Sequence, residues 1–291
     1  TPRNINLNLP SLRADGFSMS IMEKLQRARK SSITFAPEAG TQRLRDAINK
    51  NVTEEDLLKS CRTVFEGGCN AVKLYFMLGL PTETDEDVLG IADLANKVYQ
   101  CWRQYATSRA RGIRITVSTS FFVPKPFTPF QWEAQISMEE YQRRVQLLRS
   151  AITNKSIIYN WHDPDTSYLE AVFARGDRRL GKVIEEAWRN GAKFDSWSEY
   201  FNLERWLKAF ETCGVDPDFY ATRERSYEEV LPWTHISVGV RPAYFWRERN
   251  QAYKSVITPD CRVQCMGCGA DKLLECGKCD EERTRRERGE A

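Results

Sequence analysis

Apolar and polar residues alternate along several short segments in the first half of the chain. In Asn4–Leu9, Ala71–Leu78 and Ile113–Val123, almost every second side chain is apolar. Because successive side chains of a β-strand point to opposite faces, this period predicts strands with one apolar and one polar face. Ser31–Ala36 is predicted as a further strand, the second in chain order.

Helices are predicted between these strands. One runs from about Thr41 to Asn49, and the next follows Thr53, which caps it together with Asp56. A third opens at Thr84, and a fourth begins near Ser137. Strands that alternate with helices in this way indicate parallel βα units and an α/β fold.

The polar faces of the strands indicate a ligand. Helices cover the outside of a βα sheet and take the apolar faces, so Lys73, Tyr75 and Ser118 are expected on the concave side. A closed eight-stranded barrel would fill that space with apolar layers, whereas these side chains suit a polar ligand and water. Glu38 has the same parity and lies at a strand's carboxyl end, where βα folds bind ligands. The alternative is a surface glutamate that caps the next helix.

The second half of the chain has a different pattern. The predicted helices there are Ser167–Ala174, Arg178–Asn190 and Ser198–Thr212. Six of the eight tryptophans lie beyond residue 155, and so many large aromatic side chains need burial in a packed subdomain. Cysteine, glycine and charge replace hydrophobic residues after about residue 258. The predicted units are therefore 1–154, a helical subdomain at 155–257 and a cysteine-rich tail at 258–291.

Composition excludes several classes of protein. The 291 residues are 41% hydrophobic and 29% charged, as in soluble globular proteins. No apolar run approaches the ~20 residues of a membrane span, and no secretory leader is visible, so a cytoplasmic location is expected. The net charge of +3 is too small to indicate nucleic-acid binding. Because the first residue is Thr1 and not Met, a fragment of a longer polypeptide is expected.

The nine cysteines fall into two sets. Four are scattered and are expected to be buried small hydrophobic residues: Cys61, Cys69, Cys101 and Cys213. Five are crowded into the tail: Cys261, Cys265, Cys268, Cys276 and Cys279. Two CxxC pairs within this set suit tetrahedral zinc, with Cys261 as a spare or alternative ligand. An auxiliary iron–sulfur cluster also fits, because thiolates select soft metals in general.

Two longer runs of sequence carry a family resemblance. The first is Ala36-Pro37-Glu38-Ala39-Gly40-Thr41-Gln42-Arg43-Leu44 with Ile48-Asn49-Lys50, and the second is Tyr75-Phe76-Met77-Leu78-Gly79-Leu80-Pro81-Thr82-Glu83-Thr84-Asp85-Glu86-Asp87. They resemble the middle strands of radical S-adenosylmethionine (SAM) enzymes. Phe122–Phe130, Ala174–Arg179 and Leu231–Trp233 are similar to an uncharacterised family in which a cobalamin-binding-type domain precedes a radical SAM barrel.

The resemblance implies the downstream half of a partial (β/α) TIM-like radical SAM barrel, followed by the helical subdomain and the tail. Glu38 matches the residue that binds the ribose hydroxyls of SAM, and Lys50 the cation that reaches the methionyl carboxylate. The helix between them would span about 9 residues, or ~14 Å. The two side chains are therefore expected to hold opposite ends of an extended ligand.

Other positions are implied to line the same cofactor. Tyr75, Met77, Gly79 and Pro81 match the fifth barrel strand and its turn, and Ser118, Phe122 and Val123 match the sixth strand beside adenine. Lys73 faces the same predicted side and is grouped with them.

The three-cysteine loop that holds the catalytic [4Fe–4S] cluster is missing from the chain, so its ligands are expected upstream in the same polypeptide. The fragment alone is then expected to be inactive, whereas its parent would cleave SAM reductively to a 5′-deoxyadenosyl radical, with cobalamin allowed and the substrate open. Cys261-x3-Cys265-x2-Cys268 has the spacing of that loop. It lies far downstream of the SAM strands, which favours a separate metal site.

Two other functions are weighed against this one. A lysine facing a barrel interior can form Schiff bases, so Lys73 allows a non-radical barrel enzyme. No aldolase-like set of partner residues accompanies it in the sequence. The basic tail and aromatic residues allow a zinc-tailed RNA-binding adaptor, which nothing else in the sequence supports.

Overall fold

The computed structural model describes residues 33–261 and 263–270. Contacts divide the chain into two compact units. The first consists of the described residues up to Phe122 together with Glu139–His162, and the second of Val123–Met138 together with the described residues from Asp163 onward. The chain therefore passes between the units three times.

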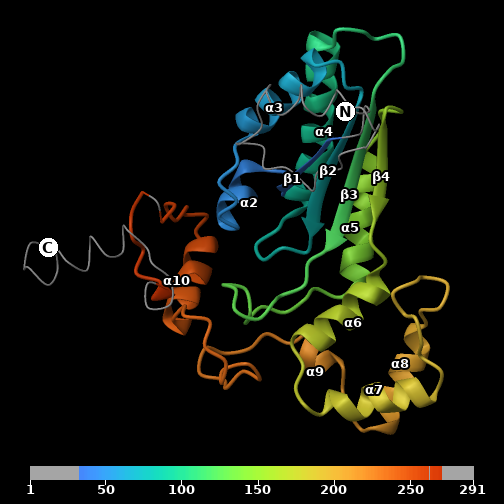
Figure 1. The fold of residues 1–291 in the computed structure, drawn as a ribbon, viewed down its shortest axis with the longest axis vertical. Coiled ribbons are helices and arrows are strands. Elements are labelled where there is room, and N and C mark those ends of the chain that lie inside the picture. Colours follow the sequence, from blue (N-terminus) through green and yellow to red (C-terminus); the bar gives the residue numbers. More distant parts are fainter. Residues whose placement is uncertain (1–32, 262, 271–291) are drawn as a thin grey trace, which may run out of the picture. The chain divides into compact units, whose positions relative to one another are not determined.

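A parallel four-stranded sheet forms the centre of the first unit (Figure 1). Its strands are β1 (Ile33–Glu38), β2 (Ala71–Leu78), β3 (Arg114–Phe121) and β4 (Ile157–Trp161). They lie in chain order, and each pairs in parallel with the next. The prediction of parallel neighbours in sequence order is confirmed for β1, β2 and β3. The predicted strand Asn4–Leu9 lies outside the described residues.

β4 was not predicted as a strand. It lies at the start of the predicted helical subdomain, 155–257, before the first predicted helix at Ser167. In the structure only Ile157 of this strand is buried. Pairing with β3, from Ile157 opposite Ile115 to Trp161 opposite Thr119, is what makes the segment extended.

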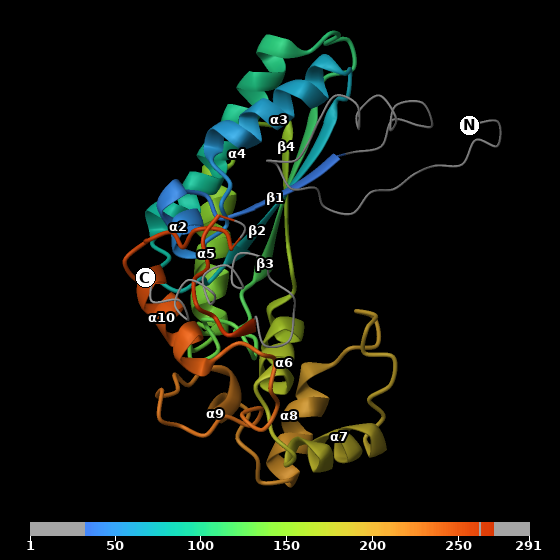
Figure 2. The ribbon, with the colours of Figure 1, turned by 60° about the vertical axis from the view of Figure 1, so that its left-hand side comes forward.

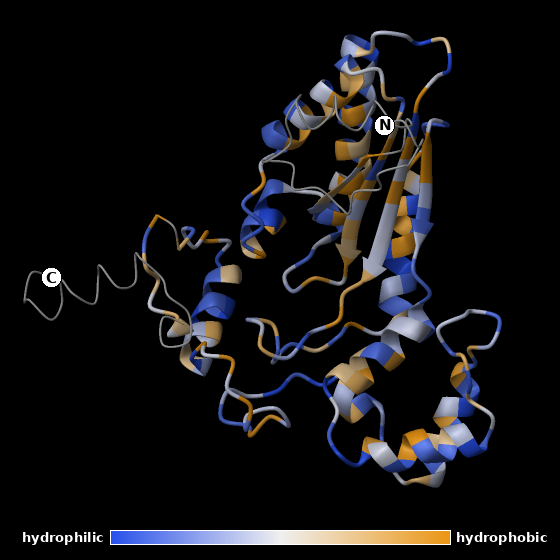
Figure 3. Ribbon diagram, viewed as in Figure 1, coloured by the Kyte–Doolittle hydropathy of each residue, from blue (hydrophilic) through white to orange (hydrophobic). Residues whose placement is uncertain are grey.

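Burial along β1 and β2 follows the predicted period of two, whereas β3 buries Ser118 of the polar face as well. In β2, Val72, Leu74, Phe76 and Leu78 are buried, and the residues between them are half-buried. Helices lie on one face of the sheet (Figure 2), and hydrophobic positions recur along the strands and on the helices beside them (Figure 3). The apolar faces therefore pack under the helices, and the mixed polar faces of the strands lie on the other side, as predicted.

The helices of the first unit begin where the sequence places their caps. They are α2 (Gln42–Ala47), α3 (Glu54–Glu66), α4 (Asp85–Tyr105) and α5 (Met138–Ala151). Thr53 and Asp56 form the predicted capping box of α3, and Thr84 and Asp87 form a second one at α4. The side-chain oxygens satisfy N–H groups that a helix start leaves without partners, and this fixes where each helix begins.

The second unit is mostly helical. Its helices are α6 (Pro164–Ala174), α7 (Leu180–Arg189), α8 (Leu203–Thr212), α9 (Asp218–Ala221) and α10 (Pro242–Ala252). The first three correspond to the predicted helices, and the last two were not predicted. α8 starts later than expected because the Asn202 side chain accepts the Arg205 N–H at 2.9 Å and caps the helix there. α6 to α9 share an apolar core that includes Val172, Val183 and Phe210.

Three of the four scattered cysteines are buried as expected, and the fourth is not. Cys61, Cys69 and Cys101 are buried, and Cys213 is half-buried. Burial raises the pKa of the Cys61 thiol well above its usual value and that of Cys101 to about 11. Within the described ranges, no helix has both the length and the apolar character needed to cross a membrane.

Candidate functional site at the ends of strands β1 and β2

Unusual backbone conformations gather where β1 and β2 end. Glu38, the last residue of β1, has φ 68°, and Thr82 in the turn after β2 has φ 67°. Gly79, directly after β2, has φ 89°. Left-handed conformations are uncommon outside glycine and concentrate at ligand sites, where the surrounding structure holds them in place. We call Glu38, Lys50 and the turn 79–83 the strand-end site.

Glu38 and Lys50 form an ion pair in this site. Lys50 Nζ lies 2.8 Å from Glu38 Oε1, and each side chain is 26% exposed. The predicted separation of the two side chains is therefore wrong. α2 has only six residues, a rise of about 9 Å. At its end Asn49 is left-handed (φ 51°), and the Lys50 N–H donates to Arg45 O at 2.9 Å. This closure turns the chain back, so that Lys50 can reach the end of β1.

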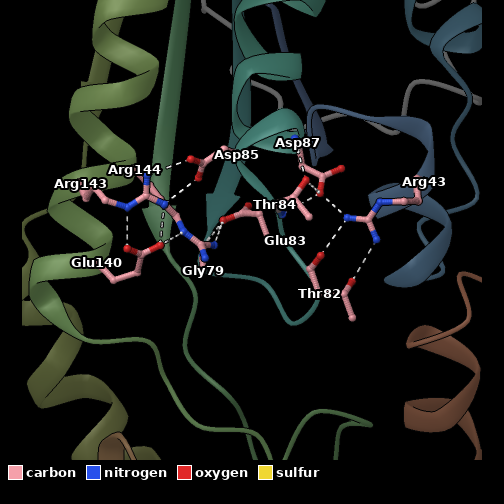
Figure 4. A network of polar contacts seen from close by, with 10 residues as sticks. All are labelled: Arg43, Gly79, Thr82, Glu83, Thr84, Asp85, Asp87, Glu140, Arg143 and Arg144. Carbon is pink, nitrogen blue, oxygen red and sulfur yellow. Dashed lines mark hydrogen bonds and ion pairs between the residues drawn. The ribbon is translucent and has the colours of Figure 1, made fainter.

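A buried carboxylate holds the turn after β2. Glu83 Oε2 accepts the Gly79 N–H at 2.7 Å, and Arg144 of α5 donates to the same oxygen. The Glu83 side chain is 1% exposed and that of Arg144 is 12% exposed. A carboxylate that accepts a backbone N–H and a guanidinium is fixed in position. The turn between Gly79 and Glu83 is thereby closed on itself (Figure 4).

Asp87, in the first turn of α4, joins this turn to α2. Its Oδ2 accepts the Thr84 N–H at 2.8 Å and the Thr84 hydroxyl at 2.9 Å. Arg43 donates to the same carboxylate and to Thr82 O at 2.9 Å, and the Thr41 hydroxyl donates to Asp87 Oδ1. Burial alone would raise the pKa of Asp87, but these hydrogen bonds outweigh it and lower the pKa. Figure 4 shows Arg43 beside Thr82 and Asp87.

Two consecutive arginines of α5, Arg143 and Arg144, form ion pairs near the start of α4. Arg143 donates to both carboxylate oxygens of Asp85, at 2.6 and 3.0 Å, and to Glu140. Arg144 Nε donates to Glu140 Oε1 at 2.7 Å. Hydrogen bonds from Arg143 and Arg144 lower the pKa of Glu140 to about 2 against the opposing effect of burial. The exposed Arg143–Asp85 pair is expected to add little stability, because water screens it.

Backbone packing also fixes the loop after β1. A Cβ atom on Gly40 would lie 2.3 Å from Asp87 O and 2.4 Å from Ile91 N. One on Gly90 would lie 2.8 Å from Thr41 Cγ2. Only glycine at position 40 allows the loop to approach the α4 backbone this closely.

The pKa of Glu83 gives a pH-dependent prediction. Burial raises it from 4.5 to about 7, although Gly79 and Arg144 act in the opposite direction. Between about pH 4.5 and 7, Glu83 is therefore protonated more often in the folded state than in the unfolded state. Because the folded state binds more protons, the contribution of Glu83 to the free energy of unfolding decreases as pH rises through this window. Glu83→Gln should remove this contribution. The difference in free energy of unfolding, wild type minus variant, should fall by about 3 kcal/mol across that window.

Urea unfolding of both proteins at a series of pH values, followed by circular dichroism, measures this difference. A difference that stays constant from pH 4.5 to 8 would contradict the raised pKa. Because the two proteins share their other titrating groups, the subtraction isolates Glu83.

Other predicted site residues lie on the same polar face of the sheet. Lys73 Nζ lies 4.5 Å from the centroid of the Tyr75 ring, a cation–π contact. Tyr75 is opposite Ser118 on β3, and Met77 is opposite Ser120. The predicted positions on β2 and β3 therefore share neighbouring rows of the sheet.

Three further predicted residues lie in the connections. Pro81 is half-buried in the turn after β2. Phe122 is the last residue of its segment of the first unit, and its N–H donates to Leu78 O at 2.8 Å. Val123 belongs to the second unit, where it joins the apolar core of α6 to α9.

Sequence reasoning missed the residues that hold the site together. Glu83 and Arg144 are separated by 61 positions, and Arg43 and Asp87 by 44. Partners so far apart leave no mark in a local pattern. The only available signal was Asp87 three residues after Thr84, which predicts the capping box but not its contact with α2.

The tail cysteines are partly described. Cys261 is exposed, Cys265 and Cys268 are half-buried, and Cys276 and Cys279 lie outside the described residues. Over residues 33–261 and 263–270, no three or more His, Cys, Asp or Glu side chains are grouped so that they could hold a metal ion. Cys261 therefore does not join Cys265 and Cys268 in such a group.

Comparison with known proteins bears on the first unit. Residues 3–95 match the Radical SAM superfamily. The chain is also similar to the uncharacterized protein MJ0966 of Methanocaldococcus jannaschii, with 28% identity over 211 residues. That alignment covers 72% of this chain and 44% of the archaeal protein, so the chain spans less than half of that relative. The superfamily match includes the whole strand-end site and supports a radical SAM-type function for this part of the chain.

Proposed function

We propose that the first unit is the SAM-binding part of a radical SAM enzyme and that the strand-end site holds the cofactor. The observation that carries the proposal is the half-buried Glu38 carboxylate at the end of β1, beside a glycine turn fixed in place after β2. Parallel βα folds bind ligands at this edge of the sheet. In this superfamily a [4Fe–4S] cluster supplies the electron for SAM cleavage.

Glu38 is assigned to the ribose. A carboxylate accepts several hydrogen bonds and suits a vicinal diol. The Lys50 ammonium group donates a hydrogen bond to Glu38 Oε1. No hydrogen bond from the described residues reaches Glu38 Oε2. One oxygen is thus held by the protein, and the other is left for a hydroxyl group of the ligand.

Lys50 is assigned a positioning role. The sequence alone favours contact between Lys50 and the SAM carboxylate, but the 2.8 Å pair places the ammonium group on Glu38 itself. A lysine that fixes the orientation of the ribose-binding carboxylate acts on every ligand that contains the ribose. This role differs measurably from binding the methionyl group.

The polar face of β2 and β3 is assigned to the remainder of SAM. Tyr75, Met77 and Ser118 offer an aromatic ring, a thioether and a hydroxyl group beside the strand-end site. Gly79 lies at the edge of this face, but its N–H is taken by Glu83. Gly79 therefore contributes a preformed, close-approaching backbone and no donor of its own.

Calorimetry with SAM and 5′-deoxyadenosine tests these assignments on the full-length, cluster-reconstituted protein. Glu38→Ala should weaken both ligands by about 1–3 kcal/mol, because buried hydroxyl groups lose their acceptor. Glu38→Gln should cost less, since one acceptor oxygen remains. Lys50→Ala should weaken both ligands equally if Lys50 positions Glu38.

Lys97→Ala is the matched control, because Lys97 forms a similar pair with Glu54 at 2.7 Å outside the site. It should leave both affinities unchanged. A loss confined to SAM in Lys50→Ala would assign Lys50 to the carboxylate instead. Unchanged SAM binding in Glu38→Ala would overturn the strand-end site as the cofactor site.

A further inference from the structure

Two buried arginines of the second unit lie together without a carboxylate partner. Arg175, the residue at the C-terminal end of α6, is 0% exposed, and Arg225, in the loop after α9, is 2% exposed. Arg225 Nη2 donates to Arg175 O at 2.7 Å, so the two residues are in direct contact. In the described part of the chain, neither guanidinium group forms an ion pair with a carboxylate. We call these two residues the arginine pair.

The arginine pair has more hydrogen-bond donors than acceptors around it. Arg175 Nη1 donates to Ala221 O at 2.7 Å, and Arg175 Nη2 donates to Arg223 O at 2.9 Å. Three further nitrogen atoms are buried and donate to no atom of the described residues: Arg175 Nε, Arg225 Nε and Arg225 Nη1. Because buried polar groups are nearly always hydrogen-bonded, three such donors in two adjoining side chains indicate a missing acceptor.

The carboxylates that act on the arginine pair are already bonded to other groups. Both oxygens of Glu229 accept hydrogen bonds from Arg223, at 2.7 and 2.8 Å. Glu133 Oε2 accepts the Tyr253 hydroxyl at 2.8 Å, and Glu133 Oε1 accepts a hydrogen bond from Arg249. These two carboxylates therefore satisfy their own partners and leave the arginine pair without a counter-charge in contact.

Both members of the pair remain charged. Burial, followed by repulsion from Arg225 and Arg223, lowers the pKa of Arg175 to about 9, and burial lowers the pKa of Arg225. A guanidinium group with a pKa of 9 is still protonated at pH 7, and arginine in general keeps its proton there. Two buried positive charges side by side are unfavourable unless an anion compensates them. The missing acceptor is therefore expected to be negative.

We propose that the arginine pair binds a small oxyanion, either inorganic phosphate or a molecule that carries a phosphate or carboxylate group. Such a group has several acceptor oxygens, so one anion can take hydrogen bonds from both guanidinium groups. Arginine suits this role better than lysine, because its planar group presents several donors at once. The site lies within the second unit and does not depend on SAM binding in the first.

The loop that carries Arg225 provides a route for the anion. Residues 223–226 form neither helix nor strand, and Glu224 and Ser226, on either side of Arg225, are exposed. The Arg225 guanidinium lies 5.3 Å from the centroid of the Trp233 ring. For an anion to reach the shielded nitrogen atoms, this loop has to move outward and close again. Tryptophan fluorescence should report that movement, because the guanidinium leaves and returns to an indole ring.

Titration of the 291-residue chain with sodium phosphate and with sodium acetate tests the proposal, with calorimetry and tryptophan fluorescence as the two measurements. Sodium chloride at matched ionic strength is the blank. At least one oxyanion should bind saturably at one site, and the tighter of the two identifies a phosphate or a carboxylate group as the ligand chemistry. Arg225→Met should weaken this binding by at least about tenfold, because charged hydrogen bonds are lost.

Arg223→Met is the matched control. It removes the same charge from the same loop, but the Arg223 guanidinium is already paired with Glu229. This variant should bind the oxyanion as wild type does. Arg225→Lys keeps the charge but removes most of the donors, so it should bind more weakly than wild type, and it serves if Arg225→Met does not fold.

Thermal unfolding gives a second readout that separates an anion site from a structural pair. Without an oxyanion, Arg225→Met should unfold at the same temperature as wild type or higher, because a buried unpaired charge is gone. With the oxyanion, wild type should gain stability and the variant should not. Three results would overturn the proposal: no saturable binding of either oxyanion, an equal response to sodium chloride, or equal losses in Arg223→Met and Arg225→Met.

Discussion

Replacing Gly40 by alanine should unfold the first unit or leave it barely stable. The new Cβ would lie 2.3 Å from Asp87 O, 2.4 Å from Ile91 N and 2.7 Å from the carbonyl carbon of Gly90. All three are backbone atoms of α4, so no side chain can rotate to relieve the clash. The loop after β1 would have to separate from α4, at a cost of about 3 kcal/mol or more.

Thermal unfolding and hydrogen exchange of β1 and β2 amides measure this effect. Gly181→Ala in α7 is the control, because a Cβ there meets no heavy atom within 4 Å and the residue is helical. Its stability should be unchanged or slightly raised. If Gly40→Ala melted and exchanged as Gly181→Ala does, the close approach of the loop to α4 would be disproved.

Removing the buried carboxylate of Glu83 should have the second largest effect. Glu83→Ala leaves the Gly79 N–H without its acceptor and takes from Arg144 its buried partner. A buried N–H that loses its acceptor costs about 1–3 kcal/mol, and Arg144 keeps only Glu140 as a carboxylate partner. The turn 79–83 should lose its shape, and the SAM affinity expected of the proposed site should fall with it.

Asp85→Ala is the matched comparison, since Asp85 pairs with the neighbouring Arg143 but is 52% exposed. Its stability should match wild type within the reproducibility of urea unfolding. Equal losses in the two variants would show that the burial of the Glu83–Arg144 pair is unimportant. A Glu83→Ala protein that is destabilised yet binds SAM normally would separate the turn from the cofactor site.

Local pattern was sufficient for much of the first unit. β2 has the predicted bounds, Ala71–Leu78, because its alternation is uninterrupted. The helix starts at Thr53 and Thr84 were predicted because a capping threonine and the acidic residues after it lie within four residues of sequence. β4 was missed because only pairing with β3 makes Ile157–Trp161 extended.

The candidate site was predicted in its location but not in its geometry. Parity and strand ends placed Glu38 and Gly79 at the same edge of the sheet. The distance between Glu38 and Lys50 was wrong, because counting residues along a helix ignores how the chain closes after it. The left-handed Asn49 that reverses the chain is set by the end of α2. Arg144 was missed because its partner Glu83 is far away in sequence.

The return of the chain to the first unit at Glu139 has a consequence for synthesis on the ribosome. The segment Glu139–His162, which carries Arg144 and β4, is made only after the chain has left the first unit at Phe122. The Glu83 carboxylate has no arginine partner until Arg144, 61 residues later, has emerged. A nascent chain that ends at Phe122 therefore exposes an unpaired β3 edge and an uncompensated carboxylate, a state in which nascent chains are prone to aggregate.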